Sequence, residues 1–203
     1  MLETHINTKI EMKNFHFALR AFGFVALAVF MSSASCELFK GADKITFTAE
    51  LEHPFNITAE ADFPGGHDYA TKPEDEVLDA ADVNADFAKN ADKIESIKIN
   101  KVTYVLSDYD SDCGTVSFSN GSFTFSDPDG SGSVVKGVTH NNLQSSQGTE
   151  YTLTFTQSEA DELSNLLVTK KKIRIHAGGH LSCTPLFMKV KVKVDCTITA
   201  RVI

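Results

Sequence analysis

Tryptophan is absent from this 203-residue chain, and only four cysteines and five prolines occur in it. The chain also has no apolar run of the roughly 20 residues that a transmembrane helix needs. It has no Cys-x-x-Cys pair, the usual starting point for thiol redox chemistry and zinc-ribbon sites. Fifteen phenylalanines and a hydrophobic content of 42% nevertheless supply the apolar volume of a core. We therefore expect one globular domain of ordinary size.

Recognisable catalytic motifs are missing as well. The chain has no Gly-x-Ser-x-Gly elbow, and the glycine pair in "GGHDY" (65–69) follows a proline in a loop, so it does not open a helix. Carboxylates are so frequent in this chain that a pair of them does not indicate a catalytic site. These absences predict a protein without enzymatic activity and without a required cofactor.

The first 35 residues have the organisation of a secretory signal peptide. Their apolar run, residues 21–31, is about eleven residues long, follows basic residues and precedes a run of small residues. Met12 is a better candidate for the translation start than Met1, because residues 2–11 carry acidic side chains that a signal seldom contains. We therefore assign residues 1–35 to a signal peptide.

Cys36 directly follows the predicted signal and is a candidate for lipidation. A standard lipobox has an aliphatic residue three positions before the cysteine, whereas this chain has Ser33 there. Acylation with palmitate-like chains would anchor the protein stably to a membrane. Residues 36–43 would then form the lipidated N-terminus and tether, and residues 44–203 the folded domain. The alternative is cleavage by an ordinary signal peptidase, which would leave a soluble secreted or periplasmic protein.

Two long stretches alternate between apolar and polar residues, as half-buried β-strands do. In residues 45–63, Pro54 interrupts the pattern, so we expect either one kinked edge strand or two strands joined at a corner. Residues 188–202 alternate without a break, and their length predicts a strand that bends between two sheets or contains a bulge. The outward lysines of this second strand would protect a sheet edge.

Shorter strands lie between these two stretches. Asn120-Gly121 indicates a β-hairpin, and a change of parity at Asn100-Lys101 indicates a β-bulge. Helices are expected over residues 83–94, capped by Asp82 or Asn84, and over residues 158–168, capped by Ser158.

Some eight strands and two short helices predict a mainly β protein. We expect a single antiparallel β-sandwich, immunoglobulin-like or related, over residues 44–203. A β-barrel is the alternative architecture.

Three stretches connect the chain to a known group: the signal that ends before Cys36, "DKIESIKINKVTYVLSDY" (92–109) and "FMKVKVKVDCTITARVI" (187–203). In these the chain resembles small envelope lipoproteins of Bacteroidota type. The resemblance implies an envelope-associated, β-rich protein. It implies no catalytic residue.

An acidic segment around residue 110 is a candidate for calcium binding. Asp108, Asp110 and Asp112 alternate as in calcium loops, although Cys113 stands where an EF-hand has glycine. If the strands on either side formed a meander, loops 108–114 and 127–133 would lie at the same end of the sheet. The predicted calcium ligands are then Asp108, Asp110, Asp112, Asp127 and Asp129.

Three cysteines remain once Cys36 is set aside: Cys113, Cys183 and Cys196. They allow one disulfide, whose partners the sequence leaves open, although Cys196 falls on the apolar side of its strand. A zinc site made by His176, His180 and Cys183 is disfavoured, because the two histidines of an extended strand would stand about 13 Å apart.

Charge is unevenly distributed. Residues 37–166 carry eight basic and twenty-four acidic side chains, whereas residues 167–203 carry eight basic and one acidic. An acidic exported protein is a poor candidate for binding nucleic acid. We expect the basic C-terminal segment to lie beside acidic neighbours within the fold.

These observations together predict a lipid-anchored cell-envelope protein, held at a membrane that is most simply the outer membrane. It would act as a structural, accessory or binding module, with an envelope protein or a glycan as partner. The alternative is a calcium-assisted adhesin or carbohydrate-binding domain that uses loops 108–114 and 127–133.

Overall fold

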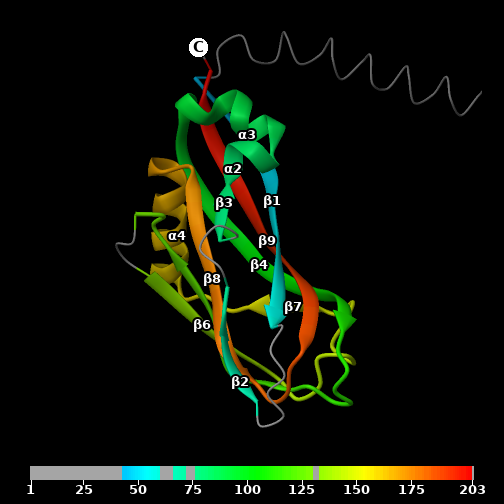
Figure 1. Ribbon diagram of the computed structural model, residues 1–203. Helices are drawn as coiled ribbons and strands as arrows, with labels where there is room; N and C mark the ends of the chain where they lie inside the picture. The colour runs from blue at the N-terminus through cyan, green and yellow to red at the C-terminus, as the bar shows by residue number, and fades with distance from the viewer. Residues whose placement is uncertain (1–42, 60–65, 72–75, 130–132, 203) are drawn as a thin grey trace, which may run out of the picture. The chain divides into compact units, whose positions relative to one another are not determined.

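A computed structural model describes residues 43–59, 66–71, 76–129 and 133–202 (Figure 1). The strands are β1 (Lys44–Ala59), β2 (His67–Ala70), β3 (Val77–Asp79), β4 (Ile94–Asp110), β5 (Phe118–Ser126), β6 (Ser133–His140), β7 (Glu150–Leu153), β8 (Lys172–Leu181) and β9 (Leu186–Arg201). The helices are α2 (Ala80–Val83), α3 (Ala85–Asn90), the 3-10 turn η2 (Ala91–Lys93) and α4 (Gln157–Thr169). The protein is mainly β, as the sequence predicts.

The strands form two antiparallel sheets, ordered β1-β9-β4-β7 and β2-β8-β5-β6, with β3 also paired to β8. Pairing is nested along the chain: β1 with β9, β2 with β8, β4 with β7 and β5 with β6. A chain paired in this way is a long hairpin rolled into two facing sheets, which is the jelly-roll topology. The predicted sandwich is confirmed, with jelly-roll rather than immunoglobulin-like connections. The barrel alternative is wrong for the described strands, because each sheet retains its own edge strands.

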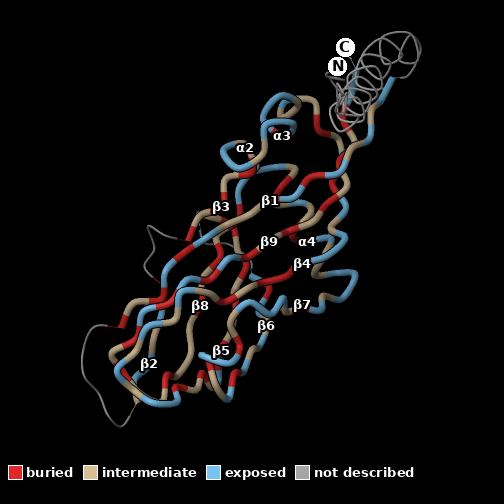
Figure 2. Tube along the Cα trace, turned by 90° about the vertical axis from the view of Figure 1, so that its right-hand side faces the viewer, coloured by how far each residue is buried: buried red, intermediate tan, exposed pale blue. Residues whose placement is uncertain are grey.

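The core lies between the sheets, where alternate residues of most strands are buried (Figure 2). β9 is the clearest case, and none of its inward residues is more than 2% exposed: Leu186, Met188, Val190, Val192, Val194, Cys196, Ile198 and Ala200. β9 pairs with β1 on one side and β4 on the other. It is therefore a central strand of one sheet. The predictions of an edge strand, and of a bend into a second sheet, are wrong.

β1 and β4 follow the alternation more closely. β1 runs through Pro54 without a corner and lies at the sheet edge, so the kinked edge strand is the correct alternative. In β4 the register with β9 shifts between Ile99 and Lys101, which confirms the predicted bulge at Asn100.

Asn120 and Gly121 do not form the predicted hairpin but lie within the single strand β5. The register of β5 with β6 shifts between Phe118 and Gly121, and Asn120 has a φ of 48°, so the pair forms a β-bulge. Gly121 is required there, because a Cβ atom would lie 2.2 Å from the Phe118 ring. The positive φ that Asn-Gly favours serves a bulge here, and not a turn.

Both predicted helices exist, with different boundaries. The first is divided into α2, α3 and η2, and Asn84 caps α3 by accepting a bond from the Phe87 amide. In α4 the cap is Thr156 rather than Ser158. Its hydroxyl accepts from the Glu159 amide, while the Glu159 carboxylate accepts from the Thr156 amide, a capping box.

The predicted signal peptide, Cys36 and the predicted tether up to residue 42 lie outside the described residues. Among the described residues, no helix is both long enough and apolar enough to cross a bilayer.

Candidate functional site

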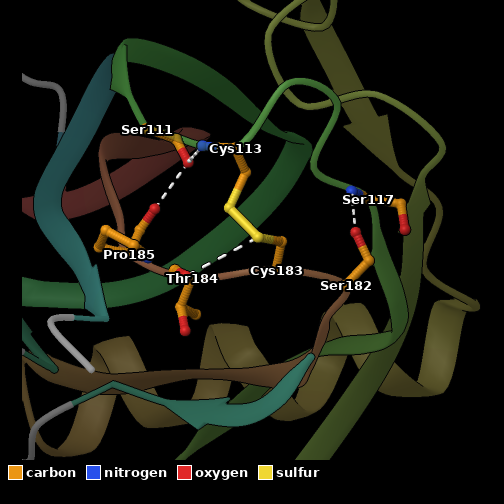
Figure 3. Close-up of a disulfide and its surroundings, with 7 residues drawn as sticks. All are labelled: Ser111, Cys113, Ser117, Ser182, Cys183, Thr184 and Pro185. Carbon is orange, nitrogen blue, oxygen red and sulfur yellow. Dashed lines mark hydrogen bonds between the residues drawn. A yellow bond between two sulfur atoms is a disulfide. The ribbon is translucent and has the colours of Figure 1, made fainter. Parts of the chain in front are cut away.

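A disulfide braces the end of the sandwich where β4 ends and β9 begins. It joins Cys113, in the loop after β4, to Cys183, in the loop before β9 (Figure 3). Cys196 is free and buried in β9. Burial raises the pKa of its thiol to about 11, so it stays protonated at neutral pH and is unsuited to nucleophilic chemistry.

Hydrogen bonds on both sides of the disulfide hold the same two loops together (Figure 3). The Ser111 hydroxyl donates to the Pro185 carbonyl at 2.6 Å and accepts from the Cys113 amide at 3.1 Å. Ser117 and Ser182 exchange two further bonds: the Ser117 amide donates to the Ser182 hydroxyl, and the Ser182 amide to the Ser117 carbonyl. The two loops are thus joined by one covalent bond and three hydrogen bonds, while the Cys113–Ser111 bond lies within the first loop.

A surface groove of about 270 Å³ lies beside this brace. Phe187, the second residue of β9, lies on the outer face of the sheet and is 36% exposed. Its register partners are Thr58 on β1 and Asp110 on β4. The groove is lined by Thr58, Ala59, Asp110, Ser111, Asp112, Pro185, Leu186 and Phe187.

The outward side chains of β9 explain the charge of this groove. Lys189 pairs with Asp108 at 2.7 Å and Lys191 with Glu52 at 3.2 Å. Lys193 lies 4.0 Å from Glu50 and 3.9 Å from Glu150. The basic C-terminal segment therefore lies beside acidic neighbours, as predicted.

Lys189, Lys191 and Lys193 form a lysine ladder on the outer face of β9. At the outward position before Lys189, the strand has Phe187 instead of a further lysine. Asp110, directly across from Phe187, and Asp112 in the adjoining loop form no ion pair within the described part of the chain. The groove therefore combines an aromatic ring with two uncompensated carboxylates. This arrangement suits a cationic group, which an aromatic face and carboxylates both attract.

The structure does not bring the five predicted calcium ligands together. β4 and β5 belong to different sheets, so the assumed meander is wrong. Loops 108–114 and 127–133 lie at opposite ends of β5, whose nine residues span about 25 Å.

Three of the five carboxylates are also occupied. Asp108 pairs with Lys189, and Lys170 contacts Asp129 at 2.9 Å and Asp127 at 3.3 Å. Asp127 is in addition buried, at 5% exposure, and accepts from the Asp129 amide. Asp110 and Asp112 are the members that remain available, and both line the groove.

The disfavoured zinc site is not assembled either. His176 contacts Glu76, His180 contacts Asp68, and Cys183 is in the disulfide. Within the described ranges no three histidine, cysteine or acidic side chains are arranged to hold a metal ion.

Glu76 belongs to a separate polar cluster on the outer face of the second sheet. Its side chain is 5% exposed and accepts from His176 Nδ1 at 2.5 Å and from the Thr71 hydroxyl at 2.9 Å. Arg174 Nε lies 3.6 Å from the same carboxylate. The Thr71 hydroxyl in turn accepts from the Ala177 amide, so the cluster fastens the segment around Glu76 to β8.

Sequence reasoning found the acidic half of the groove and missed the aromatic half. The available signal was the parity of Phe187, a large apolar residue in the outward series that Lys189, Lys191 and Lys193 continue. Glu76 left no comparable signal, because it lies in a stretch of several acidic residues.

The chain matches no known family model and no curated protein. Among solved structures it has weak similarity to a chain of Desmodium yellow mottle tymovirus, with a TM-score of 0.30, 8% identity, and coverage of 77% of this chain and 84% of that one. A chain of turnip yellow mosaic virus has a TM-score of 0.27 and 6% identity, covering 78% of this chain and 96% of that one. Similarities this low carry no conclusion about function.

Proposed function

We propose that this protein is a lipid-anchored cell-envelope protein that acts as a non-catalytic binding module, with the Phe187 groove as its binding site. The anchor is the acylated Cys36. The observation that carries the proposal is the disulfide-braced groove, which lies at the end of β1 opposite to Lys44.

Chain connectivity supports this arrangement. Residues 37–43 separate Cys36 from β1 and can span at most about 25 Å. β1 begins opposite the C-terminal end of β9, with Lys44 across from Arg201, and ends with Ala59 across from Leu186 beside the groove. Sixteen residues of strand extend roughly 50 Å. The groove therefore lies roughly 50 Å along β1 from Lys44, the residue through which the N-terminal segment joins the sandwich.

The disulfide supports a location outside the cytoplasm. Disulfides persist in oxidising compartments and are rare where cellular thiols are kept reduced. The Cys113–Cys183 bond joins two loops that several hydrogen bonds also position. The apolar run at residues 21–31 and the small residues that follow also indicate export, in agreement with the disulfide.

The chemistry of the groove indicates the class of group that binds there. Phe187 supplies an aromatic face, and Asp110 and Asp112 supply negative charge that the lysine ladder does not neutralise. A guanidinium or ammonium group, as on the surface of a basic protein partner, would satisfy both.

The lipid anchor has a direct test. Mass spectrometry of the N-terminal peptide of the purified mature protein should detect acyl chains on Cys36. Replacing Cys36 with serine should move the protein from the membrane fraction to the soluble fraction, whereas Cys196→Ala should remain in the membrane. An unmodified Cys36 in protein taken from its native membrane would refute the anchor.

Groove binding can be measured with arginine ethyl ester titrated into the detergent-solubilised full-length protein. We expect NMR signals of Phe187 and its neighbours to shift with a Kd of about 1–10 mM at low salt. Asp110→Asn combined with Asp112→Asn should weaken binding by at least about tenfold, since both carboxylates are removed. The matched control, Asp86→Asn with Asp161→Asn, makes the same charge change on two helices and should bind normally. Equal affinity of the two double variants would exclude this groove.

A further inference from the structure

A buried histidine links the two sheets. His140, the last residue of β6, is 6% exposed, and its Nε2 lies 2.9 Å from the hydroxyl of Tyr104 on β4. Its Nδ1 lies 3.1 Å from the hydroxyl of Ser146, in the loop that joins β6 to β7. One imidazole therefore connects both sheets and a surface loop.

The neighbouring groups fix the direction of these bonds. The Ser146 hydroxyl donates to the Asn142 carbonyl at 2.7 Å, so it accepts from His140 Nδ1–H. His140 Nε2 is then the acceptor for the Tyr104 hydroxyl. The complete chain of bonds requires a neutral imidazole with its proton on Nδ1. A second proton, on Nε2, would leave the Tyr104 hydroxyl without its acceptor.

Among the described residues, none supplies a counter-ion to His140. The titratable groups that face its ring are Tyr104, and Tyr151 of β7 at 4.7 Å between ring centroids. Burial lowers the pKa of His140, and burial, with Tyr151 nearby, raises the pKa of Tyr104 to about 12. Glu150, next to Tyr151, is committed to Lys101 and Lys193. The other described side chains that line the space beside the ring are apolar and come from both sheets and the loop, among them Leu106, Phe123, Leu143 and Met188.

The loop that Ser146 holds, residues 141–149, is attached to both ends of the segment that carries Asp110 and Asp112. The Gly148 amide donates to the Leu106 carbonyl at 2.9 Å, and Gln147 Oε1 accepts from the Tyr109 amide at 2.9 Å. On the far side, the Leu143 amide donates to the Val116 carbonyl, also at 2.9 Å. Displacing this loop would therefore remove its support from the acidic wall of the groove, which the Ser111–Pro185 bond and the disulfide would still join to the start of β9.

We propose that His140 and loop 141–149 form an acid-sensitive latch that holds the acidic wall of the Phe187 groove in its binding position. Protonation of His140 at Nε2 reverses its bond with Tyr104, leaves the Tyr104 hydroxyl proton without its acceptor and places an uncompensated charge between the sheets. The charge is relieved when the loop opens and the imidazole reaches water. Ligand release on acidification, the regulatory part of the inference, rests on the proposed binding function.

The sign of the effect follows from proton binding. With the loop open, His140 titrates near its ordinary pKa of about 6.5, whereas the closed state holds it neutral to lower pH. The open state therefore binds more protons as the pH falls below about 6.5, and acid favours opening. Above that pH both states are neutral at His140, and the latch is closed.

Hydrogen–deuterium exchange of the full-length protein at pH 7.5 and pH 5.0, with labelling times scaled for intrinsic exchange, tests the latch. Peptides covering 106–117 and 141–149 should lose protection at least about tenfold at pH 5.0, while peptides from β9 should not. The glutamine in His140→Gln can accept from Tyr104 and donate to Ser146 but cannot titrate. The protection of the two loop peptides in this variant should therefore be the same at pH 7.5 and pH 5.0. The control His180→Gln, which changes an exposed histidine, should keep the acid response.

An unchanged wild-type loop at pH 5.0, or an acid response retained by His140→Gln, would overturn the latch. If His140→Gln fails to fold, NMR of the wild type replaces it: the His140 ring and the loop amides must titrate with one midpoint, and separate midpoints refute the coupling. Arginine ethyl ester should bind at least about tenfold more weakly at pH 5.0 if the latch controls the groove. Absence of binding at both pH values would count against the proposed function, while the exchange result alone would still decide the latch.

Discussion

Replacing Cys113 and Cys183 together by serine is expected to lower the free energy of unfolding by about 2–4 kcal/mol. The two cysteines are 70 residues apart in sequence. Their bond therefore restricts the unfolded chain over the segment that contains β5, β6, β7, α4 and β8. The chain-entropy relation gives about 4.4 kcal/mol for a loop of this length, which we take as the upper limit. For a domain of this size the loss corresponds to a fall in Tm of about 5–15 °C.

Thermal unfolding followed by circular dichroism, with and without reductant, measures this effect. Reductant should lower the Tm of the wild type to that of the double serine variant and leave the variant unchanged. Cys196→Ala keeps the disulfide and should keep the full response to reductant. Equal melting temperatures for oxidised and reduced wild type would show that the bond contributes nothing to stability.

The alternation of apolar and polar residues was sufficient to predict most strands, because burial of one sheet face is a local property of the sequence. Alternation does not specify which strands pair. β1 pairs with β9, so Ala49 lies across from Cys196, and no feature near either residue indicates the other. The jelly-roll order follows from such distant pairings, which is why the sequence led to a sandwich but not to its connections.

The hairpin predicted from the Asn120-Gly121 turn signal was wrong, because tertiary contacts determine the conformation of this pair. Asn120-Gly121 favours positive φ, and in β5 that preference is satisfied by a bulge packed against Phe118. The calcium-site prediction depended on this hairpin, because the hairpin placed β4 and β5 in one meander, whereas the two strands belong to different sheets. Asp110 and Asp112 line the groove beside Phe187, whereas Asp127 and Asp129 of the second acidic loop do not.

Glu76→Ala is expected to lower the free energy of unfolding by about 2–3 kcal/mol. The change removes the acceptor for His176 and Thr71 and leaves Arg174 without its carboxylate. Loss of a fully buried charged partner costs about 3–5 kcal/mol, but water can reach the other members of this cluster, which reduces the cost. The His176 and Arg174 side chains are 38% and 34% exposed.

The contrast with an exposed ion pair makes this prediction specific. Glu52 also pairs with a basic side chain, Lys191, but the two side chains are 45% and 48% exposed. Its replacement by alanine should cost less than about 1 kcal/mol. Glu76→Gln, which keeps an oxygen acceptor for one of the two bonds, should lie between the two alanine variants. Urea unfolding of the three variants gives the comparison.

Hydrogen exchange adds a local readout for Glu76. The backbone bonds from the Thr71 amide to the Ala177 carbonyl and from the Ile175 amide to the Glu76 carbonyl remain in the alanine variant. The increase in hydrogen exchange of Glu76→Ala over the wild type should therefore be confined to residues 76–79 and the facing part of β8. The disulfide end of the sandwich should stay protected. Equal stability losses in Glu76→Ala and Glu52→Ala, with no local change in exchange, would mean that the buried carboxylate does not fasten β3 to the sheet.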